Sequence, residues 1–148
     1  MAKRSATPIR FDMMVSDRLA VYIRAHPGLS LSSAANRFVD EGLRMSEHPG
    51  VVFRDGPTGR RAGLAAGPDV WEIVRSIKSA RAAEPALAEQ ELLTLIADNT
   101  GTPVSVVHTA VRYWASYPNE IDDEIATADA AEEAAELAWQ RERRLLAG

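Results

Sequence analysis

Cysteine is absent from the sequence, which excludes disulfide bonds and zinc sites built from thiolates. No apolar run approaches the roughly 18 residues that a membrane-spanning helix needs. The basic first residues are not followed by the apolar segment that is typical of a secretory signal. We therefore expect a cytoplasmic protein. The chain of 148 residues has room for one ordinary domain or two very small ones.

The formal net charge of −4 is unevenly distributed. Residues 1–117 hold 14 basic and 12 acidic side chains, a net charge of +2, and residues 118–148 hold 3 basic and 9 acidic ones, a net charge of −6. The body of the chain is therefore mildly basic. The acidity is concentrated in a C-terminal tail, which is suited either to binding a basic partner or to keeping the protein in solution.

Residues 8–15 alternate in a way that predicts a short strand. One face would carry Ile9, Phe11, Met13 and Val15, and the other would carry Arg10, Asp12 and Met14. A helix is expected to begin with Ser16 as its N-cap and to stop at Pro27, and a second helix to follow its cap at Ser30. The second helix would bury a stripe made of Leu31, Ala35, Phe38 and Val39.

A single strand has two unpaired edges, so we expect it to pair antiparallel with the strand of a second copy. Such a ribbon, covered by four helices, fits a DNA major groove. Residues 8–44 resemble the Arc, MetJ and CopG type of ribbon-helix-helix protein. The resemblance implies that Arg10, Asp12 and Met14 face the bases, and that Ser32 and Ser33 hold a phosphate.

Two residues of this strand are unusual for a DNA-facing ribbon. The Asp12 carboxylate repels phosphates, although it suits a cytosine amine, and Met14 offers only apolar contact. The alternative is therefore that the ribbon serves dimerisation alone.

A hairpin is predicted after the break at His48, Pro49 and Gly50. Residues 51–53 and 60–64 would form its strands, with a turn at residues 55–59. Its basic residues are Arg54, Arg60 and Arg61. They favour a wing that contacts the DNA backbone over a merely solvated hairpin.

Three helices follow in the pattern of a helix-turn-helix unit. The first opens after Asp69 and the second covers about residues 87–99. Ala97 suits a close helix crossing, Gly101 a left-handed turn, and Val107 a side chain that packs back between the helices. Thr102 would cap the recognition helix at residues 103–116. Its outward residues would be Ser105, His108, Thr109 and Arg112.

A second resemblance covers residues 50–122. The residues on which this resemblance rests are Tyr113, Trp114, Glu120, Ile121 and Asp122. These residues resemble the terminal motif of an antitoxin-associated family of small domains, whose members are often paired with PIN-like ribonuclease toxins. Joined to the ribbon-helix-helix segment, the whole chain looks like a VapB-like antitoxin. That resemblance implies that the tail covers a toxin.

An alanine- and glutamate-rich helix is predicted at residues 121–146. Ile121, Ile125 and Trp139 are its candidate partner-binding residues, because aromatic side chains dominate small interfaces. The alternative is a partly frayed terminal helix.

We therefore expect a mainly α protein with three segments: a dimeric ribbon-helix-helix at residues 1–47, a hairpin and helix-turn-helix at 48–118, and an acidic helix at 119–148. The predicted function is sequence-specific binding to a palindromic operator in double-stranded DNA, by a homodimer that also acts as an antitoxin. A dimeric adaptor without DNA binding is the alternative. We expect no cofactor, no metal at the isolated His108, and no enzymatic activity, since no nucleophile and base pair is visible.

Overall fold

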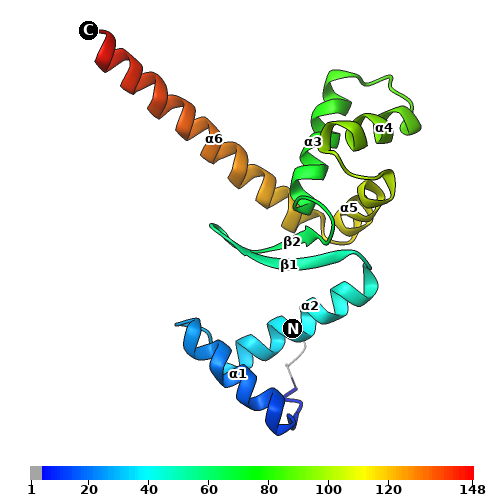
Figure 1. Ribbon diagram of the computed structural model, residues 1–148, viewed down its shortest axis with the longest axis vertical. Helices are drawn as coiled ribbons and strands as arrows, with labels where there is room; N and C mark the ends of the chain where they lie inside the picture. Colours follow the sequence, from blue (N-terminus) through cyan, green and yellow to red (C-terminus); the bar gives the residue numbers. More distant parts are fainter. Residues whose placement is uncertain (1–4) are drawn as a thin grey trace. The chain divides into compact units, whose positions relative to one another are not determined.

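The computed structural model describes residues 5–148, which form six helices and one two-stranded hairpin (Figure 1). The elements are α1 (Met13–Ala25), α2 (Leu31–Glu47), β1 (Val51–Gly56), β2 (Gly59–Leu64), α3 (Val70–Ala83), α4 (Glu89–Thr100), α5 (Val104–Ser116) and α6 (Pro118–Ala147). The prediction of a mainly α protein with a small hairpin is confirmed. The chain divides into two compact units, Met1–Leu43 and Arg44–Gly148.

The first unit differs from the sequence prediction at its start. Residues 5–12 contain no strand, and α1 begins at Met13, so Met13, Met14 and Val15 are helical. The N-cap is Asp12, whose carbonyl accepts the Ser16 amide at 2.9 Å, and Ser16 therefore lies inside the helix. The predicted strand is wrong for this single chain, because a strand needs a neighbour to satisfy its backbone groups.

The apolar stripe predicted for α2 is also largely uncovered. Among the described apolar residues of this unit, only Leu19 and Ala34 are buried. Leu31 is 57% exposed and Val39 is 52% exposed. Two short helices cannot enclose a core by themselves, and this unit exposes much of the surface that was expected to be internal.

The hairpin of the second unit is confirmed. Its antiparallel register pairs Val51 with Leu64 at the open end and Gly56 with Gly59 at the turn. Val51 and Leu64 are buried, and the hairpin packs on α3 and α5. Alternate residues of the strands thus supply one wall of the core.

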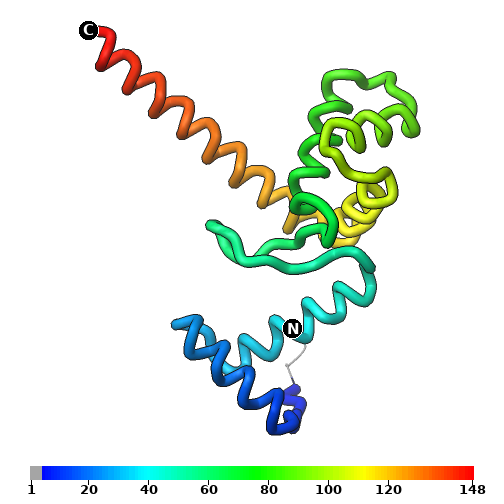
Figure 2. The backbone as a smooth tube through the Cα atoms, viewed as in Figure 1, coloured from blue at the N-terminus to red at the C-terminus, as the bar shows by residue number. Residues whose placement is uncertain are grey.

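Helix α3 is the centre of the second unit, since it contacts α4, α5, α6 and β2. At its start the Glu72 side chain accepts the backbone amide of the N-cap residue Asp69 at 2.8 Å, which is one half of a capping box. Figure 2 shows α3, α4 and α5 following one another through short turns. Their fully buried side chains include Ile73, Ile96, Val107 and Tyr113.

The turn between α4 and α5 has the predicted geometry, with one correction. Gly101 is left-handed at φ 66°, and Val107 is completely buried between the helices. Thr102 does not cap α5. It is buried, its hydroxyl lies 2.7 Å from that of Thr100, and Pro103 occupies the N-cap position without a side-chain bond.

Helix α6 begins three residues earlier than predicted and has two distinct halves. Ile121 is fully buried and Ile125 packs against the core. Every residue from 131 to 148 is exposed, including Trp139 at 54%. Within residues 5–148, no helix combines the length and apolar character needed to cross a membrane.

Candidate nucleic-acid interface

Helix α5 has one core face and one polar, solvent-facing side. Val107, Ala110 and Tyr113 are buried, whereas Ser105 and His108 are exposed. Arg112 is also exposed, and Thr109 is half-buried with its hydroxyl donating to the Ser105 carbonyl at 3.1 Å. The predicted outward orientation is confirmed for the three exposed residues. Because α5 contains no acidic residue, this side offers donors and one cation to a ligand.

The hairpin arginines have a different role from the predicted one. Arg54 donates to the Asp69 Oδ1 atom at 3.2 Å, and Arg61 lies 3.1 Å from Oδ2 of the same carboxylate. Arg54 also donates to the carbonyls of Leu64 and Gly67. The contact of this hairpin with the DNA backbone stays a prediction, while two of its arginines are engaged within the fold. The two guanidinium groups neutralise a buried aspartate and attach the hairpin to the start of α3.

Arg60, the third arginine of this hairpin, lies 3.5 Å from the carboxylate of Asp55 across the strands. Its side chain is only 24% exposed. The hairpin thus carries little unbalanced positive charge.

The basic side of α3 is likewise paired. Arg75 donates to both carboxylate oxygens of Glu132 and lies 2.9 Å from Asp129. Lys78 donates to Asp122 at 2.6 Å. These contacts attach the first half of α6 to α3, so the cations of α3 serve the fold.

The motif near residue 113 forms a hydrogen-bonded clamp between α5 and α6. The buried Tyr113 hydroxyl donates to Glu120 at 2.8 Å and accepts from Arg44 at 2.9 Å, and Arg44 also donates to Glu120 at 2.9 Å. Burial raises the pKa of Tyr113, which keeps the phenol neutral. The Trp114 indole donates to Asp122 at 2.9 Å. Ile121, predicted to bind a partner, lies in the core and has no free surface.

A buried carboxylate lies beside this clamp. The Oε2 atom of Glu124 on α6 is buried without a hydrogen-bond partner. Burial, followed by the negative charges of Glu120 and Asp69, raises the pKa of Glu124 to about 7, while Arg61 opposes the shift. Neither Glu124 nor Arg44 stood out in the sequence. Asp69 and Arg61, which act on Glu124, and Tyr113, which bonds Arg44, lie far away from them along the chain.

The predicted DNA-binding residues of the first unit include exposed side chains, but not all of their hydrogen-bonding groups are free to bind DNA. Arg10, Asp12 and Met14 all lie at the surface, but none of them is on a strand, since Arg10 and Asp12 precede α1 and Met14 belongs to it. Ser30 caps α2 as predicted and accepts the Ser33 amide at 3.1 Å. Because the Ser33 amide already donates to Ser30, it is not available for a phosphate, and the Ser30 hydroxyl in turn donates to the Ser33 hydroxyl at 2.9 Å.

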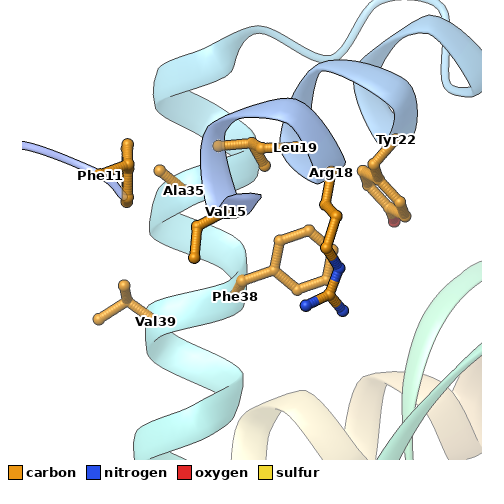
Figure 3. A pocket seen from close by; sticks show the side chains of 8 residues that line it. All are labelled: Phe11, Val15, Arg18, Leu19, Tyr22, Ala35, Phe38 and Val39. Carbon is orange, nitrogen blue, oxygen red and sulfur yellow. The ribbon is translucent and has the colours of Figure 1, made fainter. Parts of the chain in front are cut away.

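An open apolar hollow of about 420 Å³ lies between α1 and α2 (Figure 3). Its lining residues are Phe11, Val15, Arg18, Leu19, Tyr22, Ala35, Phe38 and Val39. Figure 3 shows the Phe38 ring lying below α1, near Val15 and Arg18. The hollow is therefore lined by residues from both predicted apolar faces, that of residues 8–15 and that of α2.

Family models, curated proteins and solved structures were searched, and none matches this chain. Within residues 5–148, no group of histidine and carboxylate side chains is placed to hold a metal ion. The features that bear on function are the exposed side of α5 and the exposed apolar residues of α1, α2 and distal α6.

We predict that Glu124 makes stability fall as pH rises. The folded state holds the Glu124 proton up to a pKa of about 7, whereas an ordinary glutamate loses it near 4.5. The folded state therefore binds more protons between these values, and unfolding becomes easier as pH increases. Glu124→Gln should flatten this dependence and stabilise the protein at pH 8 by on the order of 1 kcal/mol, reduced by solvent screening. Urea unfolding at pH 5 and pH 8 measures the effect.

The matched control is Glu133→Gln, which removes an exposed carboxylate from the same helix. It should leave the pH dependence unchanged. Equal responses of the two variants would contradict the role assigned to Glu124.

Proposed function

We propose that this protein is a homodimeric, sequence-specific DNA-binding regulator that uses α5 as its recognition helix. The observation that carries the proposal is the α4–Gly101–α5 turn, which presents Ser105, His108 and Arg112 on an exposed side without acidic residues. A helix of this kind fits the major groove, where polar side chains reach base edges. Ionised carboxylates would repel the phosphates of DNA. The absence of aspartate and glutamate from α5 therefore favours its approach to the DNA backbone.

Dimerisation is proposed to occur through the first unit. The apolar hollow between α1 and α2 and the exposed Leu31 and Val39 need a cover, because water contact with this much apolar surface is unfavourable. A second copy offers the same surface, and the extended residues before α1 offer unpaired backbone for a ribbon. Two copies would present two α5 helices to a palindromic operator.

Phe38→Glu should convert the dimer to a monomer, because it places a charge in the apolar hollow. Sedimentation equilibrium of the full chain measures the change, and circular dichroism checks that the helices persist. Leu137→Glu is the control, since Leu137 is exposed on distal α6 and should leave the dimer intact. A Phe38→Glu protein that still dimerises would place the contact elsewhere.

Arg112→Ala and Arg10→Ala should each weaken DNA binding about tenfold without changing dimerisation, because each removes a cation from the proposed interface. The probe is a duplex that the wild-type protein selects from a randomised library, measured by gel shift at several salt concentrations. Arg141→Ala, on exposed distal α6, is the matched loss of charge and should bind normally.

Failure of the wild-type protein to show salt-sensitive, sequence-dependent binding at low salt would contradict the regulator proposal. The chain would then be a dimeric adaptor. Normal binding by both arginine variants would instead show that DNA contacts residues other than Arg112 of α5 and Arg10.

An additional antitoxin activity is favoured by the distal half of α6. This half is exposed, it carries the apolar side chains of Leu137, Trp139, Leu145 and Leu146, and several acidic residues precede them. We propose that it covers a basic, nucleic-acid-binding surface on a PIN-like ribonuclease toxin.

Trp139→Ala should lower affinity for such a toxin by at least tenfold, since the exposed indole would be the main apolar anchor. Titration calorimetry with the product of the neighbouring reading frame measures it. Arg143 lies over the Trp139 ring at 5.5 Å. Gln140→Ala, one residue away, is the control. Unchanged affinity in the Trp139 variant would exclude distal α6 as the contact.

A further inference from the structure

An open hollow of about 570 Å³ lies beside α5 within the second unit. Its lining residues are Glu47, His48, Pro49, Thr109, Arg112, Ala115 and Ser116. Thr109, Arg112 and Ser116 follow one another at spacings of three and four, so they form one stripe along the helix. His48 and Pro49, which follow α2, also line the hollow. The hollow thus borders the side of α5 that carries Ser105.

Arg112 differs from the other cations of residues 44–112. Each of those cations is bonded or ion-paired to a carboxylate or a backbone carbonyl, namely Arg44, Arg54, Arg60, Arg61, Arg75, Lys78 and Arg81. Within this described part of the chain, the Arg112 guanidinium has neither kind of partner. It is therefore the cation that the fold leaves available to an external anion.

His48 packs against two tyrosine rings without using its ring nitrogens. Its ring lies edge-on to Tyr113 and Tyr117, with centroid distances of 5.3 and 6.0 Å. These aromatic contacts fix the direction of the imidazole, and no hydrogen bond from the described residues occupies either nitrogen. An imidazole without a hydrogen-bond partner among the described residues therefore lines the same hollow as Arg112.

Two other groups define the hollow. The Ser116 hydroxyl makes only a long bond, of 3.4 Å, to the Arg112 carbonyl and is free to turn towards a ligand. Glu47 is the acidic residue of the lining, and its carboxylate accepts from the Tyr117 hydroxyl at 3.3 Å. That bond occupies one of the two carboxylate oxygens.

We infer that this hollow binds one phosphate of the DNA backbone, held by Arg112, His48 and Ser116. The inference rests on the proposed function and divides the surface of α5 into two parts. Arg112 and its neighbours fix the position of the helix on the backbone, whereas Ser105 and His108, nearer its beginning, face the bases. His48, which lies outside the recognition helix, becomes part of the DNA contact.

The test replaces single phosphates by neutral methylphosphonates along the duplex selected by the wild-type protein. One position in each half-site should weaken wild-type binding about tenfold, because a charge-assisted bond is lost. At that position, the replacement should have no further effect on Arg112→Gln, since the partner cation is already absent. Fluorescence anisotropy with the full chain measures both affinities.

A second readout is the slope of log affinity against log salt concentration. Arg112→Gln should reduce its magnitude by about 0.9, the value for one phosphate contact. His48→Phe keeps the packing on Tyr113 and Tyr117 while removing the ring nitrogens, and should weaken binding at the same phosphate. Arg141→Gln, the matched loss of charge, should keep both the wild-type slope and the wild-type phosphate profile.

The outcomes separate this inference from the proposed function. Sequence-dependent binding in which no methylphosphonate position is coupled to Arg112 or His48 overturns the phosphate site and leaves the regulator proposal standing. A changed base preference in Arg112→Gln, with an unchanged salt slope, assigns Arg112 to a base and also overturns it. A wild-type protein that binds no duplex at low salt contradicts both.

Discussion

The hydroxyl of Tyr113 is the contact on which the second unit depends most. This side chain is fully buried, so its hydroxyl needs partners, and it obtains them from Arg44 before the hairpin and Glu120 at the start of α6. The same ring supports His48 edge-on. One buried phenol therefore connects Arg44, the start of α6 and His48.

Positive charge in this protein is used mainly to hold the fold together. Arg54 and Arg61 neutralise the buried Asp69, and Arg75 attaches α6 to α3. A buried carboxylate is costly without such partners, which explains why the arginines are not at the disposal of a ligand. Arg112 is the contrast, because its helix has no acid and its neighbours are donors. The electrostatic character of a surface thus depends on which charges remain unpaired, and the number of arginines does not reveal it.

The turn between α4 and α5 was predictable because it is local. Gly101 adopts the left-handed conformation that favours glycine, and Val107 lies at the spacing that returns it to the core. The hairpin was predictable for the same reason. The strand at residues 8–15 was not, because its formation depends on a neighbouring strand that a single chain does not supply. The roles of Arg54 and Arg61 were also missed, since Asp69 belongs to another element and nothing in the local pattern connects them.

By itself the sequence determined the mainly helical class, the turn at Gly101 and the polar side of α5, since these follow from backbone preferences and helical periodicity over a few residues. Only the tertiary structure decided which charges are neutralised, that Ile121 is internal while Trp139 is exposed, and that His48 and Arg112 line the same hollow. Those features depend on contacts between segments far apart in the chain. Burial and electrostatics act through such contacts, and sequence spacing carries no record of them.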